Sequence, residues 1–527
     1  MSLIREAAAG SDVDEKMAAL ITNSNAIRAI ASAVEGTLGP KGLDTMLVDK
    51  FGEVVITNDG VTILTMMEAN HPAARMLINI ARAQQEEVGD GTTTATVMAG
   101  ALVSAGVEQV ARGVPVARVI EGLRAGLKSA LDSMRSQARP VSGLGDRVVR
   151  QVALIAGRSH EDIADLVVQA AVLIGEEKLK DKTFKFSDTI LAEEGAENEV
   201  FMGVIIKKER MSRQMPRELK DVSVLIIDDA LEPEEIDDEA LGTEAGFARY
   251  LQLQEEFSSN LKKAAGLGIG LVLADRGVCD AAEEILADAG VMVVQRVAGK
   301  ELRRAAEHTG ARMIKRTGLK KTIDELEKCL GRAGRAYNDE KLEQVWILGG
   351  AGKPMATVLV GAATAEVVGE RERIARDAAA SVQSAITGGV VSGGGSLELA
   401  VARELEKVRE GIRGMAAYGV DCVVEALKRP MSQIVANAGF NPLEKLGDVI
   451  AAQAETGKNS LAIDCDSGLV EDMTEKGIAD PAEVKIYALR AAGEVAEAIL
   501  RIDTIIKKRE DRETQRDMQP GDNIKTF

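Results

Sequence analysis

The stretch VGDGTTT, residues 88–94, decides how this sequence is interpreted. Asp90 stands between two glycines, and three threonines open an expected helix from about Thr93 to Ala111. The free N–H groups and the dipole at a helix start favour an anion, and the threonines add hydroxyl donors. Asp90 would suit Mg²⁺ held against phosphate oxygens. An ordinary helix N-cap has the same pattern, so a structural role stays open for this stretch alone.

Two loops upstream share this chemistry. Asn58-Asp59-Gly60 places a second carboxylate beside a glycine, and TLGPKG, residues 37–42, follows an expected helix over residues 13–36. Glycines let backbone N–H groups approach a phosphate because no Cβ blocks them. A plain turn explains the first loop and a helix C-cap explains the second when each is taken singly. Three such loops close together in the chain favour a phosphate site.

A fourth glycine-rich loop lies far downstream. Residues 391–395, VSGGG, precede an expected helix, and either a close approach to a ligand or a flexible hinge explains three consecutive glycines. The run GGAGKP at residues 349–354 resembles a Walker A loop but has Pro354 where Ser or Thr is needed. His71, His160 and His308 are too scattered for a metal triad, and we expect each at the surface.

Composition limits the class of protein. The chain has 527 residues, which predicts two to four domains, and its net charge of −18 argues against a nucleic-acid partner. Only 2 % of residues are aromatic, so we expect aliphatic cores and much helix. Four widely separated cysteines predict reduced thiols, and neither a signal peptide nor a membrane span is expected. These features predict a cytoplasmic protein with no membrane partner.

The pattern along the chain changes twice. Helical periodicity dominates to about residue 140, with a strand hairpin at Thr45–Val48 and Val54–Thr57, and Ala-rich helices return from about residue 395. Between about 215 and 350, apolar runs of strand length alternate with helical stretches: Val222–Ile227, Ile269–Ala274 and Val291–Val297. The fold class is therefore multidomain α and α/β. The charged end, Lys507–Phe527, is expected to be disordered.

These motifs resemble one family. TLGPKGLD (37–44), TNDGVTIL (57–64) and VGDGTTT (88–94) have the order and spacing found in chaperonins, and GGG (393–395) and LRID (500–503) continue the match. The resemblance covers nearly the whole chain. It is closer to the thermosome-like branch, group II or the bacterial group III type, than to the bacterial branch with a separate lid.

The resemblance implies a chaperonin fold of three domains. A helical equatorial domain would comprise residues 1–140 and 393–527, and a small intermediate domain residues 141–210 and 358–392. An α/β apical domain would comprise residues 211–357. Its acidic segment near 232–266 matches a helical protrusion that serves as a built-in lid, although a charged surface excursion has the same periodicity.

The resemblance also assigns roles to residues. Asp90 matches the Mg²⁺ ligand, Asp377 the carboxylate that activates water, and Asp59 a second carboxylate near that water. A solvated helix surface is the alternative for Asp377. The usual lysine of a nucleotide-sensing loop is missing from residues 156–160, where Arg158 is a possible γ-phosphate sensor, though Arg and Lys are not equivalent. The implied nucleotide contacts, with Cys465 and Asp466 beside adenine and Asp480 on the ribose, are Thr37, Leu38, Gly39, Pro40, Asn58, Gly91, Thr92, Thr93, Thr94, Gly394, Cys465, Asp466 and Asp480.

The activity that the resemblance implies is ATP hydrolysis coupled to protein folding, with ATP and Mg²⁺ as cofactors. Unfolded or partly folded polypeptides would be the partners, enclosed by stacked rings of about eight subunits each, with no separate lid cochaperonin. Hairpin 45–57 and the strand-prone Ile499–Ile506 would pair between subunits. A Mg²⁺-dependent small-molecule phosphotransferase is the alternative, and a binding protein with a decayed ATPase site is a third.

Overall fold

The computed structural model describes residues 16–48, 50–52, 54–236 and 241–505. The chain forms two compact units, one of Met1–Arg139 with Gly388–Phe527 and the other of Pro140–Thr387. Both ends of the sequence therefore build the first unit. The division into equatorial, intermediate and apical domains stays a prediction, because the residues predicted for the intermediate and apical domains fall within one compact unit.

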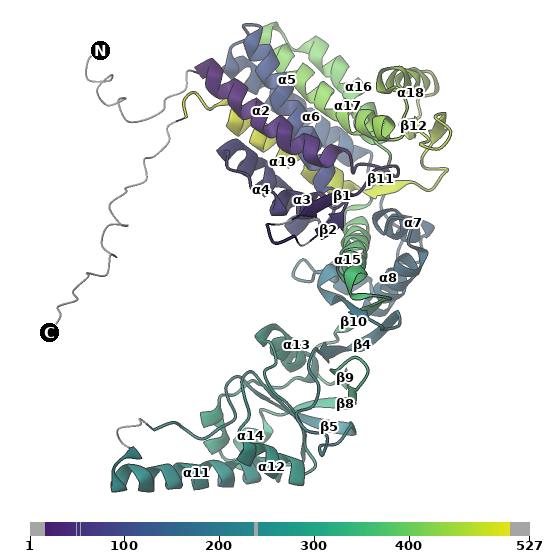
Figure 1. Ribbon diagram of the computed structural model, residues 1–527. Coiled ribbons are helices and arrows are strands. Elements are labelled where there is room, and N and C mark those ends of the chain that lie inside the picture. The colour runs from purple at the N-terminus through teal and green to yellow at the C-terminus, as the bar shows by residue number, and fades with distance from the viewer. Residues whose placement is uncertain (1–15, 49, 53, 237–240, 506–527) are drawn as a thin grey trace, which may run out of the picture. The chain divides into compact units, whose positions relative to one another are not determined.

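The first unit is dominated by helices. Its core helix, α5, packs against α2, α4, α17 and α19, and Figure 1 shows the purple α2 and the yellow α19 in the same bundle. The buried residues of this core are aliphatic or sulfur-containing, as the low aromatic content predicts. The helices are α2 (Lys16–Glu35), α3 (Gly60–Met66), α4 (Pro72–Glu87), α5 (Thr92–Ala111), α6 (Val116–Ser136), α16 (Ser396–Gly411), α17 (Ala417–Asn437), α18 (Pro442–Thr456) and α19 (Ala482–Leu500).

Glycines allow α6 and α17 to approach closely. A Cβ on Gly122 would lie 1.7 Å from the carbonyl oxygen of Ala416, and one on Gly419 would lie 2.1 Å from that of Val119. Neither glycine is in the left-handed region, so the helix backbones themselves require the small residue here. This close packing fixes the position of α17, and side chains of α17 contact the loop after α2.

Three small antiparallel sheets join the loops of the first unit. The strands are β1 (Thr45–Val48) with β2 (Val54–Thr57), β11 (Val390–Ser392) with β14 (Ala479–Pro481), and β12 (Leu461–Ile463) with β13 (Val470–Asp472). The β11–β14 pair sets Val391 opposite Asp480, so the triple-glycine loop and Asp480 are brought together by backbone pairing. The β1–β2 hairpin is the one that the sequence predicts.

The second unit is built on an eight-stranded mixed sheet in the order β3-β10-β4-β9-β8-β5-β6-β7. Strands β5, β6 and β7 are parallel neighbours, while β4, β9 and β8 are antiparallel. The strands are β3 (Ile190–Glu194), β4 (Glu199–Ile206), β5 (Glu218–Ile227), β6 (Ile269–Ala274), β7 (Met292–Val294), β8 (Gly331–Asp339), β9 (Gln344–Gly350) and β10 (Ala356–Ala362).

Helices cover both faces of the parallel part of this sheet. Leu225 and Ile227 of β5 face a core with α11 and α12, whereas Val224 and Ile226 face a core with α13. A separate core joins α7, α8 and α15 to β3 and β10. The helices are α7 (Arg147–Ala156), α8 (Glu161–Ile174), α9 (Glu176–Leu179), α11 (Glu244–Ala265), α12 (Asp280–Asp288), α13 (Gly299–Thr309), α14 (Ile323–Glu327) and α15 (Ala365–Gly388), with 3-10 turns η2 (Phe186–Thr189), η3 (Arg316–Lys320) and η4 (Gly414–Ala416 of the first unit).

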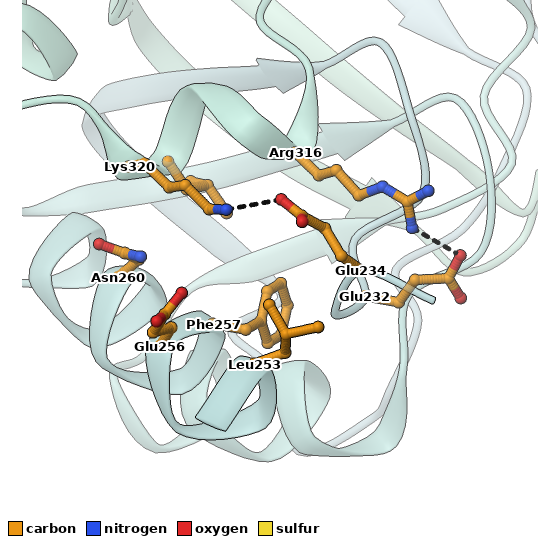
Figure 2. A pocket seen from close by; sticks show the side chains of 9 residues that line it. Glu232, Glu234, Leu253, Glu256, Phe257, Asn260, Arg316 and Lys320 are labelled. Atoms are coloured by element: carbon orange, nitrogen blue, oxygen red, sulfur yellow. Dashed lines mark hydrogen bonds and ion pairs between the residues drawn. The ribbon is translucent and has the colours of Figure 1, made fainter. Parts of the chain in front are cut away.

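The segment predicted as a protrusion is helical from Glu244 onward, as α11. Leu253 and Phe257 of α11 line a hollow that also contains Glu234 and Lys320 (Figure 2). Lys320 Nζ lies 2.6 Å from Glu234 Oε1, and this hydrogen bond lowers the pKa of the Glu234 carboxyl. The ion pair thus links the first residues of the segment to η3. None of the predicted nucleotide residues lines this hollow.

Two predictions are wrong. Ile499 and Leu500 end helix α19 instead of beginning a strand, because both side chains are buried in the helical core; Ile506 lies outside the described residues. His308 is 2 % exposed rather than at the surface, and its Nε2 accepts the N–H of Gly350 at 3.0 Å. Burial lowers the pKa of His308. The disorder predicted for Lys507–Phe527 also lies outside the described residues.

Candidate functional site

The loop after α2 is fixed from the side by α17. Asn437 Nδ2 donates to the carbonyl oxygens of Glu35 and Leu38, at 2.8 Å each. Gly39 has φ of +87°, and a Cβ there would lie 3.0 Å from Ile434 Cγ1. The Thr37 hydroxyl donates to Val34 O at 2.8 Å, so it caps the helix. Gly39 and Pro40 remain exposed, as does Lys41, so a ligand can reach this part of the loop.

The Asn58-Asp59-Gly60 loop opens helix α3. Asp59 is its N-cap: Oδ2 accepts the backbone N–H of Thr62 at 2.9 Å and its hydroxyl at 2.6 Å. Gly60 is buried, and a Cβ there would lie 2.5 Å from Thr93 Oγ1 and 3.2 Å from Thr92 Oγ1. The starts of α3 and α5 therefore meet at Gly60. A plain turn was the alternative for this loop; Asp59 instead caps a helix, and the two acid–glycine loops are in contact.

Gln84 of α4 holds the Asp90 loop in place. Its Nε2 donates to Asp90 O at 2.7 Å and to Val484 O at 3.1 Å. Gly91 has φ of +79°, and a Cβ there would lie 2.6 Å from Val484 Cγ1. The Gly91 N–H donates to Asp90 Oδ1 at 2.6 Å. One fully buried amide thus ties the loop before α5 to the first turn of α19.

The triple-glycine loop lies against Asp480. The Gly393 N–H donates to Ile478 O at 3.0 Å, and a Cβ on Gly393 would lie 3.2 Å from Asp480 Oδ2. Gly394 has φ of +66° and lies beside Met473. Gly395 has φ of +79° and opens α16. A side chain at 393 would crowd the carboxylate that the sequence places on a ribose, so the glycine is explained by close packing.

The segment predicted to lie beside adenine contacts the first loop. Lys41 Nζ lies 2.5 Å from Asp466 Oδ1, although both side chains are largely exposed. Burial, followed by the charge of Asp464, raises the pKa of the Cys465 thiol. Cys465 is therefore a neutral, half-buried group rather than a nucleophile. Lys41 was not among the predicted site residues. Its ion pair with Asp466 holds the loop at residues 37–42 beside the loop at residues 464–466.

Asp377 and Arg158 lie together in the second unit. Arg158 Nη1 is paired with Glu370 Oε1, and its Nη2 lies 4.0 Å from Asp377 Oδ2. Arg158 and Ser159 both have positive φ, of 51° and 63°, which is uncommon for residues with side chains. The Asp377 side chain on α15 is 14 % exposed. It is therefore sheltered, unlike the solvated helix surface that was the alternative for it.

The residues around Asp90 fit a magnesium ion. Mg²⁺ is usually held by one or two carboxylates together with phosphate oxygens and water, not by a cage of side chains. Within the described ranges no group of three His, Cys, Asp or Glu side chains is close enough to hold a metal. Asn58 Oδ1 is buried and accepts no hydrogen bond there. A free acceptor oxygen in the Asn58-Asp59-Gly60 loop, which meets the start of α5 at Gly60, suits a cation or its bound water.

The described helices include none that is long and apolar enough to cross a membrane. What the geometry brings together in the first unit is a set of glycine-rich loops with carboxylates at Asp59, Asp90 and Asp480. Two helix starts meet there, which is the arrangement that favours phosphate groups.

Comparison with known proteins agrees with this arrangement. The TCP-1/cpn60 chaperonin family model matches residues 30–510. A thermosome subunit of Methanocaldococcus jannaschii is 32 % identical over 94 % of this chain and 93 % of its own length. The thermosome subunit beta of Archaeoglobus fulgidus is 35 % identical over 92 % of this chain and 91 % of its own.

A solved structure supports the same conclusion. A group III chaperonin, crystallised in the open state, aligns with a TM-score of 0.87 and 48 % identity, covering 93 % of this chain and 99 % of that one. Sequence, fold and site agree with one another. The chain belongs to the TCP-1/cpn60 chaperonin family and is of the thermosome-like type.

Proposed function

We propose that this ATP-dependent chaperonin binds ATP among the loops of its first unit and hydrolyses it there to drive a built-in lid. The carrying observation is the meeting of the α3 and α5 helix starts, where Gly60 lies against the Thr92 and Thr93 hydroxyls. Free N–H groups and hydroxyls at that point would bind the phosphates. Thr94 follows on the same turn, and Leu38, Gly39 and Pro40 would contact the nucleotide from the loop after α2.

Asp90 would hold Mg²⁺ with water and phosphate oxygens, and the metal would supply charge neutralisation on those oxygens. Asp480 would accept hydrogen bonds from the ribose, while Gly394, Cys465 and Asp466 would border the nucleotide. Asp59 caps α3, and its Oδ1, which accepts a long hydrogen bond of 3.4 Å from the Val61 N–H, would orient the attacking water. Asp377 would activate that water; since it belongs to the other unit, its role in this proposal rests on the sequence match.

Two surfaces support the assembly side of the proposal. The β1–β2 hairpin exposes Met46, Val48, Val54 and Ile56, each by more than half, and a two-stranded sheet has free edges for a neighbouring copy. The first half of α11 exposes Phe247 and Leu251. We propose that the hairpin joins subunits within stacked rings of about eight. Helix α11 would be the built-in lid, which makes a separate lid cochaperonin unnecessary.

Asp90→Asn is the variant that tests the site. If Asp90 is the metal ligand, the Mg²⁺ concentration for half-maximal ATP turnover rises at least about tenfold. The factor by which Mg²⁺ increases the affinity for ADP should fall to a similar extent. Turnover without any added acceptor also separates a chaperonin from the phosphotransferase alternative. ATP turnover is measured by phosphate release and ADP affinity by calorimetry, both on the assembled protein.

The control for this test is Asp132→Asn. Asp132 is an exposed carboxylate on α6 that pairs with Arg135 on the same helix. Its substitution removes one negative charge from the same unit without touching the glycine loops. An unchanged Mg²⁺ requirement in Asp90→Asn, or the same shift in both variants, would contradict the metal assignment.

A further inference from the structure

Lys485 is a buried cation between two carboxylates. It lies in the first turn of α19, and its Nζ is 2.9 Å from Asp480 Oδ2 and 2.8 Å from Glu398 Oε1. The Lys485 residue is 8 % exposed and Glu398 is fully buried. Glu398 itself lies in the first turn of α16, directly after the triple-glycine loop. Two charged side chains, from the first turns of α16 and α19, therefore meet behind the carboxylate predicted to contact ribose.

Burying these charges has a cost that the fold alone does not require. A buried ion pair is commonly no more stable than apolar residues of similar volume, because both ions lose their hydration. Burial lowers the pKa of Lys485, but the charges and hydrogen bonds of Asp480 and Glu398 raise it by more. The pKa of Lys485 therefore lies above its usual range. The two carboxylates therefore favour the charged form of Lys485, and this one cation faces both of them.

The Asp480 carboxylate is held from one side only. Lys485 binds its Oδ2, and Gly393 packs beside the same oxygen, while the side chain keeps 20 % of its surface exposed. The backbone of Asp480 is fixed by its pairing with Val391. A carboxylate with one oxygen anchored and part of its surface open is oriented to accept a hydrogen bond from a ligand hydroxyl.

The same turn of α19 also reaches the phosphate loop. Val484, the residue before Lys485, accepts a hydrogen bond from Gln84, which donates to Asp90 O as well. Val484 also packs against Gly91. The first turn of α19 therefore sets the position of Asp480 and of the Asp90 loop together.

We propose that Lys485, backed by Glu398, is a positioning residue that fixes the Asp480 carboxylate for the ribose hydroxyls of the bound nucleotide. The proposal rests on the proposed function, which assigns Asp480 to the ribose. Lys485 does not touch the nucleotide in this account. Glu398 in turn holds Lys485 in place through its own ion pair with Nζ.

The test compares ADP with 2′,3′-dideoxy-ADP, which lacks the ribose hydroxyls and, like ADP, is not hydrolysed. A hydrogen bond between a hydroxyl and a carboxylate should favour ADP roughly tenfold or more in the native protein. The informative variant is Lys485→Met/Glu398→Met, which replaces both buried partners with apolar groups and leaves the net charge of the cluster unchanged. Asp480→Ala is the reference variant, and affinities are measured by calorimetry on the assembled protein.

We expect the double variant to lose the preference for ADP nearly as completely as Asp480→Ala, while its affinity for dideoxy-ADP changes less than about twofold. If the role of Lys485 is purely structural, the double variant will bind ADP and dideoxy-ADP more weakly by the same factor, and that outcome would overturn the proposal. A retained preference in the double variant, with loss in Asp480→Ala, would also overturn it but leave the ribose assignment intact. If Asp480→Ala itself keeps the preference, the ribose assignment fails, and the positioning role fails with it.

Discussion

ATP turnover in the Asp377→Ala variant is expected to fall by a factor of roughly 10² to 10⁴, the usual contribution of a positioned general base. ATP binding should persist, because none of the glycine-rich loops that would bind the nucleotide includes this residue. Arg158 keeps its partner Glu370 when Asp377 is removed, so the local packing of α15 should survive. The measurements are phosphate release at saturating ATP and nucleotide affinity by calorimetry.

Glu372→Gln is the matched control for that variant. Glu372 is a carboxylate on the same helix, and it pairs with Arg376 one turn away at 2.6 Å. The pair is half-buried and lies on one helix, where an i,i+4 pair contributes about 0.3–0.5 kcal/mol to stability. Turnover in Glu372→Gln should therefore remain near the native rate. Unchanged turnover in Asp377→Ala would remove the water-activating role from Asp377.

The second large effect is on stability. Gly122→Ala should lower the free energy of unfolding of the first unit by about 3 kcal/mol, at the upper end of what overpacking costs. The added Cβ would lie 1.7 Å from the carbonyl oxygen of Ala416 and 2.9 Å from Gly419 Cα, and neither backbone atom can rotate away. Helices α6 and α17 would have to separate. Differential scanning calorimetry on the assembled protein measures the loss.

Gly447→Ala is the same substitution in a different environment. Gly447 lies inside helix α18, and nothing would lie within 4 Å of its added Cβ. Alanine is favoured over glycine in a helix interior by up to about 1 kcal/mol, so this variant should be slightly more stable than the native chain. Opposite signs for the two variants support the close approach of α6 and α17. Destabilisation of similar size in both would contradict it.

Local sequence signals predicted the loops and the helices between them well. Gly91 stands at a helix start that turn chemistry and periodicity mark, and β1 and β2 have the bounds that the sequence predicts. Short elements were missed where periodicity has too few residues to act on, as in α3. Most of the large sheet was also missed: β8 alternates glycine and arginine with alanine, and such residues carry a weak strand signal.

The supporting contacts of the site could not be predicted, because they join residues far apart in the chain. Gln84 and Val484 are separated by 400 positions, and Lys485 meets Glu398 from another helix. The sequence offers one local signal for the buried cluster: Lys485 is a charged residue between apolar neighbours in α19. For Ile499 the β-branched side chain suggested a strand, but burial in the helical core outweighed that preference.

Electron microscopy of the purified protein, with and without Mg²⁺ and ATP, tests the central claim most directly. An ATP-driven chaperonin subunit should appear as stacked rings in both conditions, and ATP should change the end views as the lid segments around α11 close over the chamber. The exposed β1–β2 hairpin should lie between neighbouring subunits of each ring. Single small particles in both conditions would contradict the account.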